Sequence, residues 1–419
     1  MDNSLLNERF CAPNYKRKKR TMSKARRCPG CDLLVLPQTA TQGHSAYCPR
    51  CHTRLYRGGL AHFNAELAIA VACLILYIPT ISLPLITIRL VGQMIPATLA
   101  SGTIALAPTF PEVAILILFC SAIAPLLLMS AVVSAQFSLR FRHFRIFKVS
   151  LWILSHLKQW TMLEVFLVSL AISCFKVQEV AEIYVGIGLY CLISMQILLS
   201  VLLTKISVRR YWDAWQPEDE HISDKLDTVC HCCQLTQEAL LDCRRCGSPL
   251  HHRIPKSLQK TWAYLITASI FILPANLYPI SIFMNNGKRI EDTIFSGVAG
   301  LVKTGMTGIA IIIFVASIAV PVAKIIGLAY ILLCIQFKKQ SQHLQRMRIF
   351  RIVHWIGKWS VMDLFVIAIM VALIDRGQIL DFTPGPGAIA FAVVVILTML
   401  AAESLDSRLI WDKYEQRTK

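Results

Sequence analysis

Eight apolar stretches recur along the chain, each about as long as a membrane-crossing helix. A spanning helix needs roughly 20 largely apolar residues, and the stretches that meet this length are 67–88, 113–137, 151–175, 183–203, 262–283, 306–337, 352–374 and 388–405. Only 16% of the residues are charged, whereas ordinary soluble domains carry roughly 25%. A soluble globular fold is therefore excluded, and the pattern predicts an all-α polytopic membrane protein.

Basic residues are distributed unequally between the two sides of these spans. A net charge of +18 is typical of a nucleic-acid binder or of a membrane protein whose Lys and Arg gather on one side. An even number of spans places both termini on one side, and that side carries most of the 43 Lys and Arg residues. The opposite side holds Arg89, Lys176, Lys288, Arg289, Lys303 and Arg376. This bias predicts cytoplasmic termini and accounts for the charge without nucleic acid.

The chain contains one pattern twice. Pro79 and Pro84 in the first span recur as Pro274 and Pro279 in the fifth. Further pairs join Thr98, Ser101 and Gly102 to Thr293, Ser296 and Gly297, Pro125 to Pro321, and residues 160–166 to 359–365. Each half is a cysteine-rich segment followed by four spans, and four spans return the chain to the same side. We therefore expect a tandem parallel repeat, related by an axis along the membrane normal.

This repeat divides the chain into six predicted parts. They are a basic N-terminal tail (1–27), a first ribbon (28–60), a first four-span membrane unit (61–208), a second ribbon with its linker (209–256), a second four-span membrane unit (257–406) and a cytoplasmic tail (407–419).

Eight of the 15 cysteines form CxxC pairs at metal-ligand spacing. They are Cys28, Cys31, Cys48 and Cys51 in the first half, and Cys230, Cys233, Cys243 and Cys246 in the second. Two CxxC pairs in succession are the sequence motif typical of a zinc ribbon, in which four thiolates surround the ion and close its coordination shell. Cytoplasmic thiols stay reduced, which disfavours disulfides. We predict two structural Zn²⁺ ions; redox or regulatory chemistry and an iron centre are the alternatives.

Three ionisable residues lie inside predicted spans, namely Glu164, Lys324 and Asp363. Such residues are costly in a bilayer and are usually paired or functional. Glu164 and Asp363 occupy matching repeat positions, but Leu128 stands where the repeat would place a second lysine. Two acids therefore share one base, which favours a proton relay over the alternative of a structural lock.

Thr161 and Ser360 each precede one of these acids by three residues, on the same helical face. Each hydroxyl is expected to extend the polar network; the alternative is that it bonds its own helix.

Proline is expected to interrupt the first span of each half and to free backbone groups for a lipid-binding cup on the outward side. The residues concerned are Pro79, Pro84, Pro274, Asn276 and Pro279. A simple kink near the outer interface is the alternative. The segment 381–387, which contains two Pro-Gly pairs, is expected to form a rigid turn before the last span.

Specific motifs resemble one known family. The stretches LPANLYPI at 273–280, EDTIFSG at 291–297 and WSVMDLF at 359–365, together with the paired ribbons, resemble the paraquat-inducible protein A family. The resemblance implies tetraspanin-like four-helix units in the inner membrane of a Gram-negative bacterium, and a polar core of Lys324, Ser360 and Asp363. It also implies transport of phospholipids between the inner and outer membranes with a periplasmic MCE-domain tunnel protein. Glu164 stands where the family usually has an aspartate.

These observations predict a membrane lipid-transport subunit, driven by protons through the polar network, rather than an enzyme. The sequence has no GxxxxGK[ST] phosphate loop, which disfavours ATP hydrolysis by this chain. Two alternatives remain: a non-catalytic assembly platform for the MCE partner, and a zinc- or redox-responsive membrane sensor.

Overall fold

A computed structural model describes residues 26–36, 44–57, 63–90, 93–108, 111–177, 182–216, 228–285, 288–303, 305, 307–337, 342–374 and 380–412. The chain divides into two compact units. The ribbon unit comprises Met1–Leu60 and Ser207–Pro255, and the membrane unit comprises Ala61–Ile206 and Lys256–Lys419. Nearly all of the predicted N-terminal tail and most of the predicted C-terminal tail lie outside the described residues.

The ribbon unit is built from short antiparallel hairpins. β1 (Arg26–Arg27) pairs with β2 (Leu34–Val35), β3 (Ser45–Tyr47) with β4 (Arg54–Arg57), and β8 (Thr228–Val229) with β9 (Thr236–Gln237). Helix α9 (Val208–Trp215) belongs to the same unit and buries Tyr211 and Trp212 completely.

The membrane unit has two halves that run through nearly the same order of elements. The first contains α2 (Phe63–Ser82), β5 (Ile86–Leu90), β6 (Gln93–Ala97), α3 (Ser101–Leu106), α4 (Pro111–Leu118), η1 (Phe119–Ile123), α5 (Ala124–Phe141), α6 (Phe144–Leu157), α7 (Leu163–Val177), β7 (Glu182–Val185) and α8 (Ile187–Lys205).

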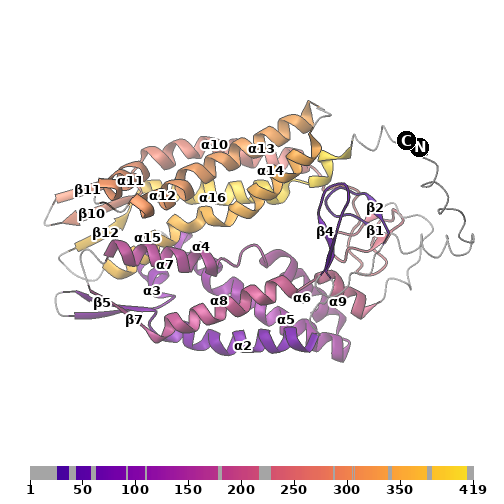
Figure 1. Ribbon diagram of the computed structural model, residues 1–419, viewed down its shortest axis with the longest axis horizontal. Coiled ribbons are helices and arrows are strands. Elements are labelled where there is room, and N and C mark those ends of the chain that lie inside the picture. Colours follow the sequence, from indigo (N-terminus) through magenta and orange to yellow (C-terminus); the bar gives the residue numbers. More distant parts are fainter. Residues whose placement is uncertain are drawn as a thin grey trace, which may run out of the picture. The chain divides into compact units, whose positions relative to one another are not determined.

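The second half contains α10 (Ser257–Leu277), β10 (Ser281–Asn285), β11 (Lys288–Asp292), α11 (Ile294–Lys303), α12 (Thr307–Phe314), η3 (Val315–Ala319), α13 (Val320–Gln336), α14 (His343–Ile356), η4 (Gly357–Val361), α15 (Met362–Ile374), β12 (Leu380–Pro384), α16 (Pro386–Ser404) and η5 (Ser407–Ile410). Figure 1 shows the halves side by side, with both small sheets at the same end of the helices.

Six helical segments of the described residues are long and apolar enough to cross a membrane. They are Phe63–Ser82, Pro111–Phe141, Ile187–Lys205, Ala310–Gln336, His343–Val371 and Pro386–Ser404. Large apolar side chains on them face outward, such as Ile75 (63% exposed) and Ile78 (68% exposed) on α2. Water penalises such exposure and lipid does not. The chain is therefore a mostly helical, multi-pass membrane protein.

Four of the eight predicted spans differ from the observed helices. The stretch 151–175 is not one helix, because α6 ends at Leu157 and α7 begins at Leu163. The stretches 67–88 and 262–283 leave their helices at Ser82 and Leu277 and enter strands β5 and β10, and the stretch 183–203 begins in strand β7. Hydropathy alone cannot locate such changes, because apolar residues occupy buried strands as readily as helices.

A π-helical turn precedes a proline at matching places in the two halves. η1 lies before Pro125 and η3 before Pro321, each proline being in the first turn of the following α-helix. Proline removes a backbone donor and clashes with the preceding turn, and a π-turn relieves both problems without ending the helix.

Two three-stranded antiparallel sheets tie the first and last helices of each half together. Their strand orders are β6-β5-β7 and β11-β10-β12. At the entry to the last helix, the amides of Gly188 and Gly387 donate to the carbonyls of Pro84 and Pro279, at 3.1 and 3.0 Å. A Cβ at Gly186 or at Gly385 would lie 2.1 Å from the same proline oxygens. Glycine is therefore required for this approach.

The segment predicted as a rigid turn at 381–387 is instead mostly strand and helix. β12 occupies Leu380–Pro384, and α16 begins at Pro386 after Gly385. The strand forms because β10 supplies a pairing edge, which the sequence of the segment itself does not reveal.

Candidate functional site

Each of the two acids that were predicted to lie within spans is in the first turn of an α-helix. Glu164 is in the first turn of α7, after the break at 158–162, and Asp363 is in the first turn of α15, directly after the 3₁₀-helix η4. The start of an α-helix carries a partial positive charge from its unpaired N–H groups. Both acids therefore occupy positions that favour a negative charge.

Helices α7 and α15 pack against each other along the seam between the halves. The rings of Phe166 and Phe365 meet edge to face, with centroids 5.6 Å apart. The Ser169 hydroxyl lies 3.0 Å from the carbonyl oxygen of Met362, close to the start of α15. The repeat thus brings its two acid-bearing helices together, one from each half.

Lys324 is buried on α13 and contacts Ser360. Its side chain is 1% exposed, and Nζ donates to the Ser360 hydroxyl at 3.0 Å. Ser360 in turn donates to the carbonyl of Gly357 at 3.0 Å. Asp363, which is 8% exposed, follows Ser360 by one helical turn. In the first half, Leu128 fills the position matching Lys324 and is fully buried.

Glu164 pairs with a lysine that the sequence reasoning did not select. Lys358 Nζ of the second half lies 3.4 Å from Glu164 Oε1 of the first half. Their side chains are 27% and 43% exposed, so water screens the pair in part. In the repeat, Lys358 occupies the position of Gln159, directly before the motif that bears the acid.

Thr161 makes the local contact that was the alternative expectation. Its hydroxyl donates to the Lys158 carbonyl three residues earlier, at 3.2 Å. A second link across the seam joins Gln159 Nε2 to His354 Nε2 at 3.0 Å. Neither residue of that link was predicted as part of the site.

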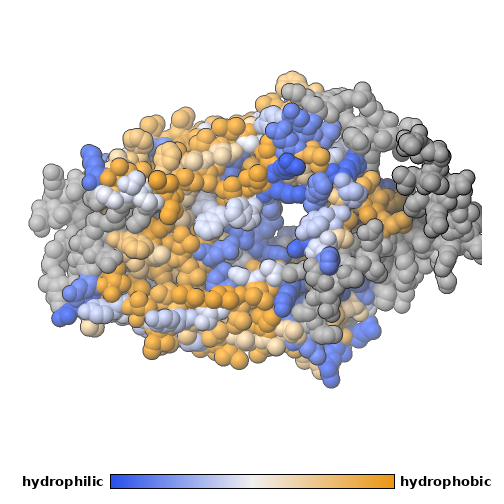
Figure 2. Space-filling view, viewed as in Figure 1, coloured by the Kyte–Doolittle hydropathy of each residue, from blue (hydrophilic) through white to orange (hydrophobic). Residues whose placement is uncertain are grey.

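A cavity of about 260 Å³, which we call the seam cavity, lies where these groups meet. Its polar lining includes Gln159 and Glu164 from the first half and Lys324, Arg351, His354 and Lys358 from the second. Glu164 and Lys324 thus face one space. In Figure 2, hydrophobic residues cover both halves, and hydrophilic residues gather between them on the face in view.

The five predicted cup residues lie at the sheet end of the helices. α2 and α10 run through Pro79 and Pro274 for three more residues, so the interruption expected at these two prolines is wrong. The helices end before Pro84 and Pro279, so the predicted spans are interrupted there. Asn276 donates to the Ile272 carbonyl within α10 at 2.8 Å. Pro84 and Pro279 follow the helices and accept the glycine amides described above.

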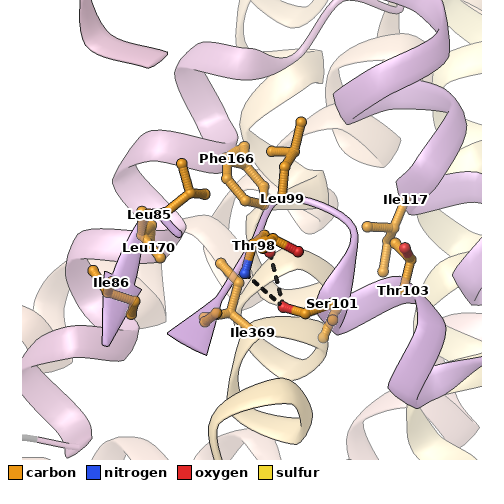
Figure 3. Close-up of a pocket in the computed structure, with 13 residues that line it drawn as sticks. Leu85, Ile86, Thr98, Leu99, Ser101, Thr103, Ile117, Phe166, Leu170 and Ile369 are labelled. Atoms are coloured by element: carbon orange, nitrogen blue, oxygen red, sulfur yellow. Dashed lines mark hydrogen bonds between the residues drawn. The ribbon is translucent and has the colours of Figure 1, made fainter. Parts of the chain in front are cut away.

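Near the sheet of the first half, a small crevice lies between that half and α15 (Figure 3). Its lining includes Leu85, Thr98, Phe166 and Ile369. Ser101 Oγ accepts from the Thr98 amide and donates to its carbonyl, at 3.1 and 2.8 Å. The volume is about 20 Å³, enough for a water molecule and too small for a lipid.

The CxxC pairs form four knuckles of one geometry. In each, the first cysteine donates its amide to the carbonyl five residues on, and its own carbonyl accepts from the amide four residues on. The residue at that fourth position is left-handed in every knuckle: Asp32 (φ 64°), His52 (φ 57°), Gln234 (φ 58°) and Gly247 (φ 62°). The repeat therefore extends to the ribbons at the level of single hydrogen bonds.

The knuckles gather the eight predicted cysteines into two clusters of four. Within each cluster the Sγ atoms lie within 4.8 Å of one another, and all eight cysteines are buried. In the first cluster the Sγ atoms are 3.5 Å apart for Cys28 and Cys51 and 3.6 Å apart for Cys31 and Cys48, and in the second they are 3.5 Å apart for Cys230 and Cys246 and for Cys233 and Cys243. Tetrahedral bonds of about 2.3 Å place thiolates roughly 3.8 Å apart. Both clusters can therefore hold a metal ion.

The charge of the sulfurs also fits a bound cation. Hydrogen bonds from Cys230 and Cys233 lower the pKa of Cys243 to about 7. The bond from Cys233 to Cys230 raises the pKa of Cys233 far above its ordinary value. Two thiols of the cluster, Cys243 and Cys246, thus have a lowered pKa and two, Cys230 and Cys233, a raised one, and a metal ion is what allows four thiolates to coexist. When bound, the ion cross-links the knuckles of a unit that has few apolar residues to bury.

The ribbons contact each other within their unit. Arg253 Nη1 lies 2.7 Å from Asp32 Oδ2, which joins the segment after the second ribbon to a knuckle of the first. Arg245, which is buried, donates to Asp213 on α9 at 2.9 Å and lies over the Trp212 ring.

Comparison with known proteins places this architecture in a family. The family described as paraquat-inducible protein A matches residues 63–216 and 258–415, one segment in each half. The chain is 38% identical to lipophilic envelope-spanning tunnel protein A (LetA) of Escherichia coli K12 over 393 residues, covering 93% of this chain and 91% of that protein.

Two further relatives agree. A probable intermembrane transport protein of Haemophilus influenzae is 34% identical over 94% of this chain and 97% of its own length. The intermembrane transport protein PqiA of E. coli K12 is 31% identical over 92% of this chain and 95% of its own length. No solved structure matches the chain. With matches in both halves and relatives that align over nearly their full length, the chain belongs to the paraquat-inducible protein A family.

Proposed function

We propose that this protein moves phospholipids between the inner and outer membranes of a Gram-negative bacterium, and that proton transfer through the seam drives the movement. The observation that carries this proposal is the meeting of Glu164, Lys324 and Lys358 at one cavity between the halves. Charged groups are kept at such a place only when they are paired or functional. The names of the relatives, which include intermembrane transport proteins, supply the class of process.

The proposed relay uses the difference between the two acids. Asp363 is almost fully buried and follows Ser360, the partner of Lys324, by one helical turn, whereas Glu164 is partly exposed beside Lys358. In this proposal, a change in packing at the α7–α15 seam alters the distance between each acid and the lysines. The proton affinity of each carboxyl group then changes, because a nearby cation favours the ionised form. In this proposal Ser360 positions Lys324, and Thr161 stays outside the relay.

The surrounding assembly is also part of the proposal. Four spans in each half give cytoplasmic termini, and the ribbons hold two Zn²⁺ ions as structural elements. A periplasmic MCE-domain protein is the proposed partner that receives or delivers lipid at the sheet end, where Pro79, Pro84, Pro274, Asn276 and Pro279 lie. No step of the proposal requires the chain to act as an enzyme.

Reconstitution tests the proposal directly. The full-length protein is placed in vesicles with a periplasmic MCE-domain protein, and transfer of a fluorescent phospholipid to acceptor vesicles is recorded with and without an imposed proton gradient. We expect transfer in the wild type that responds to the gradient, and loss of that response in Asp363→Asn and Glu164→Gln. Glu112→Gln changes an exposed acid at the start of α4 and serves as the matched control.

The assembly platform remains the second candidate, because the contacts of Lys358 with Glu164 and of Ser169 with Met362 tie the halves together. In that case Asp363→Asn and Glu164→Gln transfer lipid as the wild type does, provided that the variants still bind the partner. That result would overturn the relay.

A further inference from the structure

We propose that the seam cavity binds the phosphate group of a phospholipid headgroup. This inference rests on the proposed function for its lipid, and it adds a site and a chemical class of ligand. The cavity lies between two segments far apart in sequence, with Gln159 and Glu164 on one side and residues of α13, η4, α14 and α16 on the other.

The charges of the lining favour an anion. Arg351 and Lys358, which are both partly exposed, contribute two cationic groups, whereas Glu164 is the single carboxylate among the lining residues. A phosphodiester carries one negative charge, so a headgroup phosphate complements a lining in which basic groups outnumber the carboxylate.

The side chains of the basic lining residues suit phosphate oxygens, and two of them are partly exposed. Arg351 on α14 and Lys358 on η4 are both partly exposed and lie about two helical turns apart along one face. A guanidinium presents a fork of donors that matches phosphate oxygens, and an ammonium adds a point charge. Lys324 lies deeper and is oriented by Ser360.

The remaining lining favours a lipid over free phosphate. Phe350, Trp355, Trp359 and Met399 supply an apolar surface beside the cations. Trp355 is 70% exposed, so this surface continues to the outside of the membrane unit. Pockets for drug-sized ligands begin at about 300 Å³, and a cavity of about 260 Å³ accommodates a headgroup while the acyl chains stay outside.

Binding at this site would compete with the ion pair across the seam. Lys358 lies 3.4 Å from Glu164, so a phosphate that engages Lys358 draws it away from the carboxylate. The headgroup and the Glu164 carboxylate are therefore linked through one shared lysine.

Equilibrium dialysis with the full-length protein in an uncharged detergent tests the site. The probe is dihexanoyl phosphatidylglycerol, a water-soluble lipid with one phosphodiester, and we expect saturable binding of one molecule per chain. Arg351→Gln and Lys358→Gln should each weaken binding about tenfold, which corresponds to about 1.4 kcal/mol. Arg348→Gln, an exposed position on the same helix outside the cavity, is the matched control and should bind as the wild type does.

Further arms identify the chemistry. Dihexanoyl glycerol lacks the phosphate, and equal binding of it would overturn the inference in favour of a purely apolar pocket. Equal affinity for inorganic phosphate would overturn the assignment to a lipid. Lys358→Arg keeps the charge and should retain binding, which separates loss of the site from loss of folding. Wild-type affinity in both glutamine variants would place the site elsewhere.

The result is independent of the proposed proton coupling, because the dialysis contains neither a gradient nor a partner. Failure of the gradient response in vesicles overturns the coupling and leaves this site standing. Absence of lipid binding alongside gradient-driven transfer overturns this site and leaves the coupling standing.

Discussion

Lys358 of the second half lies 3.4 Å from Glu164 of the first, so an ion pair bridges the two copies of the repeat. The repeat itself does not dictate this pair, because Gln159 occupies the position of Lys358 in the other copy. Leu128 likewise occupies the position of Lys324 in the first copy, so at these two repeat positions only the second half carries a basic residue. The two halves share a fold and differ in charge at the seam.

The Glu164–Lys358 pair should contribute little to stability. Its side chains are 43% and 27% exposed, and ion pairs of this kind are worth about 0–1 kcal/mol after screening. We expect Glu164→Gln and Lys358→Gln each to lower the unfolding temperature slightly, with a coupling within that range in a double-mutant cycle. A coupling of about 3 kcal/mol or more, the range for breaking a buried pair, would contradict a screened pair and indicate a lock.

Metal content should follow the two cysteine clusters. We expect two zinc ions per chain by elemental analysis of the purified protein, and about one in Cys233→Ser, because each cluster supplies four ligands to one ion. Cys232→Ser is the matched control, since Cys232 is next in sequence but outside the cluster. A strong chelator should melt the ribbon unit, as zinc binding supplies folding free energy there. Equal zinc loss in both variants would contradict this ligand set.

Several parts of this fold follow from the sequence because they depend on local spacing. The CxxC pairs define their clusters, since a knuckle is a closed turn of a few residues. Pro125 and Pro321, predicted as matching repeat positions, occupy the same place in their helices, and the pairs Thr98–Ser101 and Thr293–Ser296 make the same hydrogen bonds in both halves. Each of these features is set within about one helical turn.

Other parts could not be read from the sequence, because they depend on contacts between distant segments. The break before Glu164 lies within an apolar stretch that reads as continuous helix. The strands β7 and β12 form only against β5 and β10. The pairing of Lys358 with Glu164 depends on the packing of α7 against α15, which brings the two residues together from distant parts of the chain.

Alanine at the paired glycines tests the close approach that joins the first and last helices. Gly186→Ala and Gly385→Ala would each place a Cβ 2.1 Å from a proline carbonyl oxygen, which is backbone and cannot rotate away. We expect each to cost about 1–3 kcal/mol, the usual range for overpacking, measured as a lower unfolding temperature. Gly297→Ala in α11 meets nothing within 4 Å and should leave stability unchanged or raise it slightly. Equal behaviour of all three variants would contradict the steric requirement.

Ser360 and Thr161 occupy equivalent positions in the two copies of the repeat, but their hydroxyl groups have different hydrogen-bond partners. Substitutions at the two positions can therefore be compared directly. Among its described contacts, the Thr161 hydroxyl bonds only the Lys158 carbonyl in the break between α6 and α7, whereas the Ser360 hydroxyl also accepts from the buried ammonium of Lys324. Ser360→Ala therefore removes an acceptor from a charge that is 1% exposed, at a cost of about 1–3 kcal/mol. Thr161→Ser keeps its hydroxyl and should be nearly neutral. Lys324→Met on the Ser360→Ala background removes the buried charge, and we expect it to recover most of the lost thermal stability while lipid transfer stays low. If Ser360→Ala melts at the wild-type temperature and transfers lipid normally, Lys324 does not depend on Ser360, and the polar contact between α13 and η4 is dispensable.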